Sequence, residues 1–185
     1  MSIIDLIILG KIQEQNCSAY ELVNILEEQN INKWIKISSQ GIYRNINILH
    51  EKGYLSGEKV KEGNMPEKTV YSITTQGHRY FQKLMLEISK NFEYFFFNFN
   101  AVISNIDKVE KRLALKYLEN INISIKNHAA EFNKSYKFHK DKIPYHGKAI
   151  LDLYYQTFNN VLVPWIKKFI SRYNSVNRLS YRIKK

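Results

Sequence analysis

The sequence is poor in residue types that mark particular classes of protein. Its 185 residues include one cysteine, three prolines and seven glycines. A single cysteine cannot form an internal disulfide and has no second thiol to share a metal, so we expect a protein of the reducing cytoplasm. The scarcity of glycine and proline argues against a sandwich of many short strands and favours helices.

The chain also lacks a long apolar run. The opening segment IIDLIILG is too short to span a bilayer and includes the charged Asp5. No positively charged segment precedes it and no small-residue cleavage site follows it. We therefore expect neither a signal peptide nor a membrane partner.

Motifs of enzymes and metal sites are missing as well. The sequence has no P-loop, no G-x-G-x-x-G and no G-x-S-x-G nucleophile turn. Cys17 precedes a helix start, where a lowered thiol pKa would permit redox sensing, although a semi-buried inert thiol is the simpler interpretation. The five histidines are scattered without ligand spacing: His50, His78, His128, His139 and His146. We expect no enzyme, no metal and no cofactor.

Positive charge is present in excess but is unevenly distributed. The formal net charge of +11 suggests an anionic partner. Residues 1–90 hold 11 Lys and Arg against 10 Asp and Glu, whereas residues 91–185 hold 17 against 7. The charge therefore does not by itself locate a nucleic-acid interface. We interpret the excess as a source of solubility and of long-range attraction to DNA.

The first half of the chain predicts three helices followed by a hairpin. IIDLIILGKI has apolar residues at helical spacing, and Ser18 with Glu21 forms a capping box for a second helix. Ser38 or Ser39 caps a third helix, which ends at Gly53. The residues that this helix buries share one helical face: Ile42, Ile46 and Leu49.

The hairpin and the helix after it complete the element order of a winged helix-turn-helix. YLSGEKV and TVYSIT have strand composition, and the charged segment KEGNMPEK between them forms a projecting loop. Thr74 or Thr75 then caps a long helix whose apolar stripe continues through Phe99. We predict a mainly α (α+β) fold: an N-terminal winged helix-turn-helix with a two-stranded wing, followed by a C-terminal helical dimerisation domain.

The second half is predicted to be helical throughout. One helix covers Ile106 to about Lys140, with its apolar stripe at Val109, Leu113, Tyr117, Ile121, Ile125 and Phe132. A last helix follows the break at Ile143-Pro144. Pro164 lies inside this last helix and lacks a backbone donor, so we expect a kink or break near Val163.

Four segments follow from these patterns. We expect a winged helix-turn-helix over residues 1–80, a linking long helix over 81–100, a helical dimerisation domain over 101–175 and a basic tail over 176–185. A core or a dimer seam is the expected use of the dense aromatic residues, and a pocket for a small aromatic effector is the alternative. The residues assigned to the dimer interface are aromatic or apolar: Phe92, Phe95, Phe99, Tyr154, Phe158, Leu162, Trp165 and Phe169.

The outer face of the third helix carries the groups that a major groove requires. Hydroxyl, amide and guanidinium groups reach phosphates and base edges, and the unpaired amides of the helix start favour an anion. The alternatives are packing by Tyr43, a solvated or intramolecular salt-bridge role of Arg44, and plain solubility of the wing lysines. The predicted DNA-binding residues are Lys36, Ser38, Ser39, Gln40, Tyr43, Arg44 and Asn47, with Lys61, Asn64 and Lys68 from the wing.

Three segments resemble the PadR family of bacterial transcriptional regulators: SAYELVNILEE, SSQGIYRNINILHEKGYL and NMPEKTVYSITTQGHRYF. The resemblance covers roughly residues 3–82, and YYQTFNNVLVPWIKKFI is more weakly similar to the family's dimerisation helices. It implies that Tyr43 and Arg44 bind phosphate or position the recognition helix. It also implies that Lys68 is the wing lysine and that Tyr71 packs the wing onto the helices.

The chain departs from the family pattern in the wing. Met65 stands where the family usually has arginine, and Asn64 replaces a common glycine. This difference implies a weaker grip of the wing on the minor groove.

The resemblance implies a cytoplasmic homodimer that binds an inverted-repeat operator in double-stranded DNA. It further implies a repressor that a small-molecule effector releases. An alternative function from another class is a winged-helix interaction module that binds a protein or another anionic partner through the basic C-terminal half.

Overall fold

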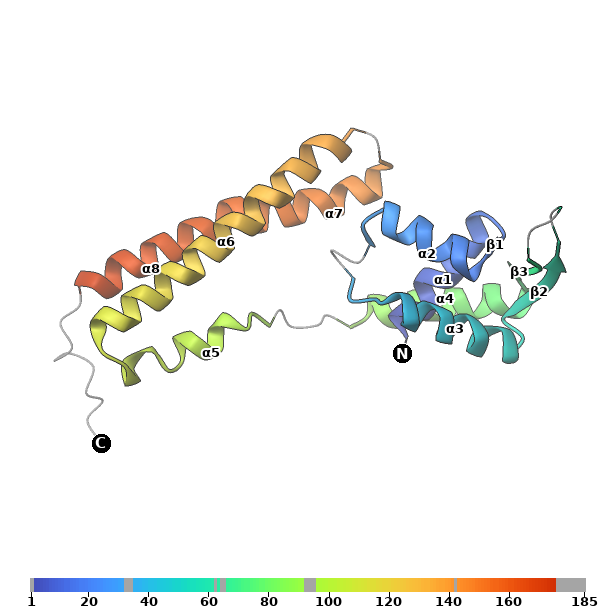
Figure 1. Ribbon diagram of the computed structural model, residues 1–185, viewed down its shortest axis with the longest axis horizontal. Coiled ribbons are helices and arrows are strands. Elements are labelled where there is room, and N and C mark those ends of the chain that lie inside the picture. Colours follow the sequence, from blue (N-terminus) through green and yellow to red (C-terminus); the bar gives the residue numbers. More distant parts are fainter. Residues whose placement is uncertain are drawn as a thin grey trace. The chain divides into compact units, whose positions relative to one another are not determined.

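The chain forms two units, Met1–Tyr94 and Phe95–Lys185, each with its own hydrophobic core. The computed structural model describes residues 2–31, 35–61, 63, 66–91, 96–141 and 143–175. The first unit has the winged helix-turn-helix order that the sequence predicts (Figure 1). Its elements are α1 (Ile3–Glu14), β1 (Cys17–Ser18), α2 (Ala19–Glu28), α3 (Ser39–Glu51), β2 (Leu55–Val60), β3 (Lys68–Ile73) and α4 (Thr75–Ser89).

The sheet has three antiparallel strands in the order β1-β3-β2. β2 and β3 form the predicted hairpin, in which Leu55 pairs with Ile73. The third strand, β1, pairs Cys17 with Tyr71 and is not predicted from the sequence. Two residues are too few to show an alternating pattern, so the sequence contains no signal for this strand. Through β1 the start of α2 is joined to the sheet.

Side-chain caps fix the starts of α2 and α3. The Ser18 Oγ accepts from the Glu21 amide at 3.3 Å, and the Glu21 carboxylate accepts from the Ser18 amide at 2.7 Å. This confirms the capping box. Of the two candidate serines, Ser38 is the N-cap of α3, since its Oγ accepts from the Gly41 amide at 3.1 Å.

The turn after α3 is fixed by backbone geometry. Gly53 adopts a φ of 72°, and its amide donates to the His50 carbonyl at 2.9 Å, as expected for a residue just past a helix end. The Tyr54 carbonyl then accepts from the Thr74 amide at 3.1 Å. Gly77 lies so close to the same carbonyl that an added Cβ would collide with its oxygen. This contact holds α4 against the turn that ends α3.

α4 is shorter than the sequence predicts. A continuous helix through Phe99 is wrong, because α4 ends at Ser89. The Ser89 hydroxyl and the Asn91 side-chain amide donate to carbonyls three and four residues earlier, at 3.0 Å and 2.9 Å. Polar side chains thus satisfy carbonyls of the last turn and stop the helix. Two predicted dimer residues lie outside the described residues: Phe92 and Phe95.

The second unit is helical, as predicted, and a long helix packs against two helices that follow each other (Figure 1). Its elements are α5 (Phe99–Ile103), the short η2 (Ile106–Lys108), α6 (Lys111–His139), α7 (Tyr145–Gln156), the π-helical η3 (Thr157–Leu162) and α8 (Val163–Ser175). The buried stripe of α6 differs from the predicted one at its start. Ala114 and Leu118 are fully buried, whereas Leu113 and Tyr117 are 39% and 38% exposed.

The predicted interruption near Val163 is confirmed. The helix widens into a π-helix over residues 157–162, and Pro164 is the second residue of α8. Proline cannot donate to the carbonyl four residues earlier, so the backbone hydrogen bonds of the helix must be rearranged at this point. The Val163 amide donates instead to the Phe158 carbonyl, five residues earlier.

We predict that Gly77→Ala lowers the free energy of unfolding by about 3 kcal/mol, because the added methyl group overpacks a backbone carbonyl. Urea denaturation followed by circular dichroism measures the change. Gly147→Ala in α7 is the matched control, since its added Cβ would meet only ordinary contacts from 3.5 Å. A Gly77→Ala variant as stable as the parent would contradict the prediction.

Candidate nucleic-acid interface

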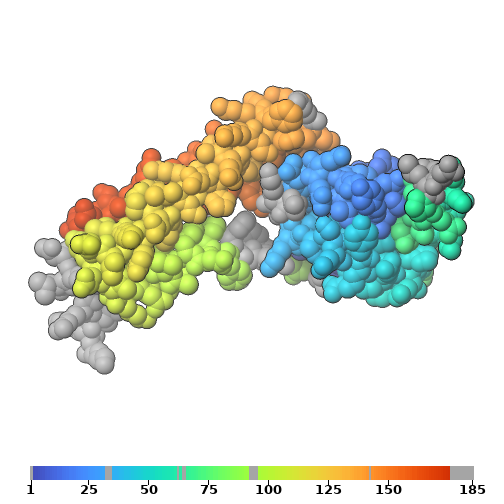
Figure 2. Space-filling model, in the orientation of Figure 1, coloured from blue at the N-terminus to red at the C-terminus, as the bar shows by residue number. Residues whose placement is uncertain are grey.

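α3 lies at the surface of the first unit (Figure 2). Its outer face carries polar side chains. Gln40, Tyr43, Arg44 and Asn47 follow each other at intervals that place them on one helical face. All four are exposed. The structure therefore brings together, on one accessible face, the residues that the sequence predicts for the major groove.

Packing by Tyr43 and a salt bridge of Arg44 gain no support from the described contacts, whereas a solvated Arg44 agrees with them. Tyr43 is 41% exposed, so its ring is not a core residue. Arg44 is exposed and forms no salt bridge with any residue that the structure describes. Both side chains are available to a partner.

The start of α3 adds hydroxyl groups and backbone amides to this face. Lys36, Ser38 and Ser39 are all exposed. The first amides of a helix have no acceptor within the helix and favour an anion. The Ser39 hydroxyl donates to the Glu27 carboxylate at the end of α2, at 3.1 Å. This carboxylate beside the recognition helix was not singled out from the sequence.

The inner face of α3 is apolar apart from one residue. Ile42, Ile46 and Leu49 are at most 3% exposed, which confirms their predicted burial. Asn45 shares this face and is 8% exposed. Its side-chain amide donates to the Asp5 carboxylate at 2.7 Å. The available signal was its spacing, because Asn45 lies three residues after Ile42 and so falls on the apolar stripe.

The Asp5 carboxylate joins three helices. Besides Asn45 of α3, it accepts from the Tyr80 hydroxyl of α4 at 3.1 Å, while Asp5 itself belongs to α1. Burial and the neighbouring carboxylate raise the pKa of Tyr80 to about 12, so the phenol stays protonated and donates. The Tyr80 ring stacks on Tyr54, with centroids 4.3 Å apart. α3 is thereby connected through one buried carboxylate to α1 and α4.

The wing residues differ in what they contact. The Lys59 ammonium lies 3.2 Å from the Glu67 carboxylate across the hairpin, and Lys61 is exposed. Tyr71 packs partly buried against the core of the first unit, as the resemblance implies for the wing aromatic. Asn64, predicted to contact DNA, lies outside the described residues.

Lys68 connects the wing to α2. Its ammonium lies 2.9 Å from the carboxylate of Glu21, and its side chain is 33% exposed. Glu21 also accepts from the backbone amide and the hydroxyl of Ser18. These hydrogen bonds, led by the Ser18 amide, and the Lys68 ammonium lower the pKa of Glu21 to about 2. A DNA contact of Lys68 stays a prediction, and the structure gives this side chain an internal partner.

The predicted dimer residues contribute to the core of the second unit to different degrees. Leu162 is 8% exposed and belongs to that core, and Tyr154 is partly buried. Trp165 is 39% exposed and stacks between two phenylalanine rings at 5.7 Å and 5.9 Å. The others pack partly buried against the core: Phe99, Phe158 and Phe169. Among the members of this set that the structure describes, Trp165 thus has the largest exposed fraction.

Other kinds of site find little support in the described part of the chain. Cys17 is 3% exposed, and burial raises its pKa to about 11, which favours the inert thiol over a redox sensor. No cluster of three or more metal-binding side chains occurs among the residues described. None of the helices in the described ranges is both long enough and apolar enough to cross a membrane.

Comparison with known proteins adds a family match. The model of the family described as "Transcriptional regulator PadR-like family" matches residues 8–83, which confirms the resemblance seen in the sequence. No functionally curated protein matches the chain.

Several solved structures share the fold over nearly the whole chain. PadR of Bacillus subtilis in complex with operator DNA has a TM-score of 0.79 at 15% identity, covering 93% of this chain and 99% of PadR. The same protein in complex with p-coumaric acid has a TM-score of 0.76 at 13% identity, covering 95% and 99%. The virulence activator AphA of Vibrio cholerae has a TM-score of 0.69 at 16% identity, covering 92% and 98%.

We predict that Glu21→Gln lowers stability at neutral pH and that the deficit narrows in acid. The folded pKa of Glu21, about 2, lies below its ordinary value of 4.5. The ionised carboxylate therefore stabilises the fold above about pH 4.5, and this contribution is lost as the pH falls toward 2. Thermal unfolding of the parent and the variant between neutral and acidic pH measures the difference. A deficit that is constant with pH would contradict the assignment.

Proposed function

We propose that this PadR-like transcriptional regulator, which matches the family over residues 8–83, is a homodimeric repressor of the cytoplasm. The dimer binds an inverted-repeat operator through α3, and a small-molecule effector releases it. The observation that carries this proposal is the exposed polar face of α3 at residues 40, 43, 44 and 47. The fold it shares with PadR of Bacillus subtilis, which was solved with operator DNA, supports the assignment.

The side chains of α3 divide into base readers and phosphate binders by their chemistry. Arg44 is suited to guanine, since a guanidinium donates to its O6 and N7, and the amides of Gln40 and Asn47 are suited to adenine. The Tyr43 hydroxyl and the Lys36 ammonium are suited to phosphate oxygens. Lys61 lies beside the wing loop and follows the backbone of the flanking duplex.

Two-fold symmetry determines the operator. Two copies of α3 enter successive major grooves only if the half-sites lie about one helical turn apart, ~34–36 Å. Selection of bound duplexes from random DNA therefore yields an inverted repeat with this spacing. A selected site without two-fold symmetry would contradict the dimer, and no enrichment at all would contradict DNA binding.

The dimer forms through the second unit. Trp165 and Val161 are 39% and 57% exposed on successive helical turns, and they supply apolar surface for a symmetric seam. The aromatic rings behind them, among them Phe99 and Phe169, support Trp165 from within the same unit.

Release by an effector acts as a population shift. A ligand that prefers one arrangement of the dimer moves its two α3 helices away from the spacing of the operator. PadR of Bacillus subtilis was solved with p-coumaric acid, and the aromatic residues of the second unit suit a ligand of this kind. AphA is an activator, so repression is tested separately, by the fall in transcription when the protein is added to an operator-bearing template in vitro.

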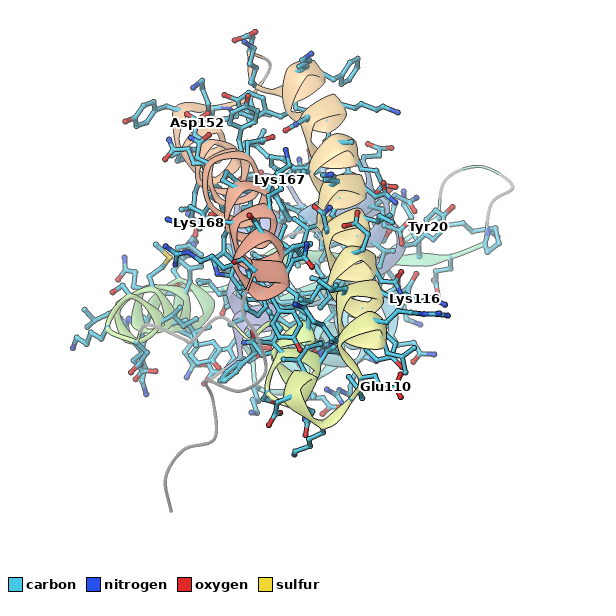
Figure 3. All side chains as sticks on the ribbon, turned by 90° about the vertical axis from the view of Figure 1, so that its left-hand side faces the viewer. Tyr20, Glu110, Lys116, Asp152, Lys167 and Lys168 are labelled. Carbon is cyan, nitrogen blue, oxygen red and sulfur yellow. The ribbon has the colours of Figure 1, made fainter. Side chains whose placement is uncertain are left out.

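A second candidate function rests on charge. Residues 91–185 hold 17 Lys and Arg against 7 Asp and Glu. Lys116 on α6 and Lys167 and Lys168 on α8 are exposed (Figure 3) and form no salt bridge with residues that the structure describes. These exposed cations suit an interaction module that binds a protein or another anionic partner.

We predict that Arg44→Ala weakens operator binding about tenfold to hundredfold while the fold is kept, because one base- or phosphate-binding side chain is lost from an exposed position. Fluorescence anisotropy with the selected duplex measures the affinity. Arg79→Ala is the matched control, since Arg79 is also exposed but belongs to α4. Near-full affinity of Arg44→Ala would contradict the role of α3.

The same titration separates the two candidate functions. We predict that reversing Lys167 and Lys168 to glutamate weakens binding to every duplex to a similar and salt-dependent extent. Abolition of binding by this reversal, with Arg44→Ala and Lys68→Glu unchanged, would instead favour the interaction module.

A further inference from the structure

The recognition helix is attached to its unit by a polar contact that hydrophobic packing does not require. Asp5 and Asn45 are each 8% exposed. One oxygen of the Asp5 carboxylate accepts from Asn45 at 2.7 Å, and the other accepts from the Tyr80 hydroxyl at 3.1 Å. The Ser2 hydroxyl oxygen accepts from Asn45 and from the Asp5 amide, each at 3.1 Å. The network therefore joins the start of the first unit to Asn45 of α3 and Tyr80 of α4.

Stability alone is a weak explanation for this network. Replacing a buried polar set by well-packed apolar residues of similar volume is often neutral or stabilising. The same helix already buries Ile42, Ile46 and Leu49 against the core. Apolar contacts are not directional, so they fix how closely α3 packs against the core more than they fix its rotation about its own axis. Hydrogen bonds to a buried carboxylate weaken steeply with distance and angle, and therefore fix that rotation.

Rotation of α3 decides what its outer face can read. Asn45 is adjacent in sequence to Arg44, and Tyr43 and Asn47 lie two residues to either side. A turn of the helix about its axis would move all three outward side chains relative to the base edges. A bidentate base contact needs both of its hydrogen bonds, so it is sensitive to such a shift.

We infer that Asp5, Asn45 and Tyr80 are positioning residues that fix the rotational setting of α3 and so determine which bases it reads. This inference rests on the proposed function. Because Tyr80 belongs to α4, the last helix of the first unit in chain order, the setting of α3 is also tied to α4. Withdrawal of Tyr80 would leave one oxygen of a buried carboxylate without its donor, so a shift of α4 changes the constraint on α3.

The test compares two tyrosines of one stacked pair. Tyr80→Phe removes the hydroxyl that donates to Asp5, whereas Tyr54→Phe removes a hydroxyl that makes no hydrogen bond with the residues described. Both variants keep the ring and the stack at 4.3 Å. Affinities for the selected operator and for a scrambled duplex of the same composition are measured far below the unfolding transition, where each variant is fully folded by circular dichroism.

We expect Tyr80→Phe to lower the ratio of operator to scrambled affinity about tenfold, the loss of roughly one base contact, and Tyr54→Phe to leave it unchanged. Because both proteins are fully folded in the titration, a loss of stability alone does not move this ratio. If Tyr80→Phe fails to fold, Asp5→Asn replaces it, since it keeps the size of the side chain but provides only one acceptor oxygen.

The outcomes separate the inference from its premise. The positioning role is overturned if Tyr80→Phe leaves the ratio of operator to scrambled affinity unchanged, or if Tyr54→Phe lowers that ratio equally. Either result leaves the proposed function standing. A wild-type protein that binds the two duplexes equally overturns the proposed function itself.

Discussion

The arrangement of the first unit depends on one buried anion. The Asp5 carboxylate needs donors in an interior from which water is excluded, and it obtains them from Asn45 on α3 and Tyr80 on α4. α1, α3 and α4 must therefore come together in one geometry for this charge to be stabilised. The apolar core supplies most of the driving force, and the carboxylate selects among the ways of packing it.

Different interactions stabilise the two ends and the inner face of α3. Ser38 caps its start and Gly53 closes its end, so local geometry satisfies amides and carbonyls there. The inner face holds the helix in the unit, which leaves the outer face free of structural duties. The wing is attached separately, through the contact of Lys68 with Glu21 at the start of α2. A change in one attachment need not disturb the other.

Local signals in the sequence predicted much of this structure. The capping box at Ser18, the glycine after α3 and the interruption before Pro164 each follow from chemistry within a few residues. The predicted helix through Phe99 was wrong because the side chains of Ser89 and Asn91 satisfy carbonyls of the last turn of α4, a local ending that the continuing apolar stripe obscured. Other contacts could not be predicted because their partners lie far apart in the chain. Lys68 looked like a free wing cation because its partner lies 47 residues earlier in the chain. The hydrogen bond of Asn45 with Asp5 could not be predicted from the sequence for the same reason, since the two residues lie 40 positions apart.

The Glu27 carboxylate, bonded to Ser39, places a negative charge beside the first turn of the recognition helix. Such a charge repels phosphate whatever the base sequence, and it acts where the helix start would otherwise attract a phosphate group. Under the proposed function, this charge weakens binding to DNA that lacks the operator, so the protein spends less time at such sites.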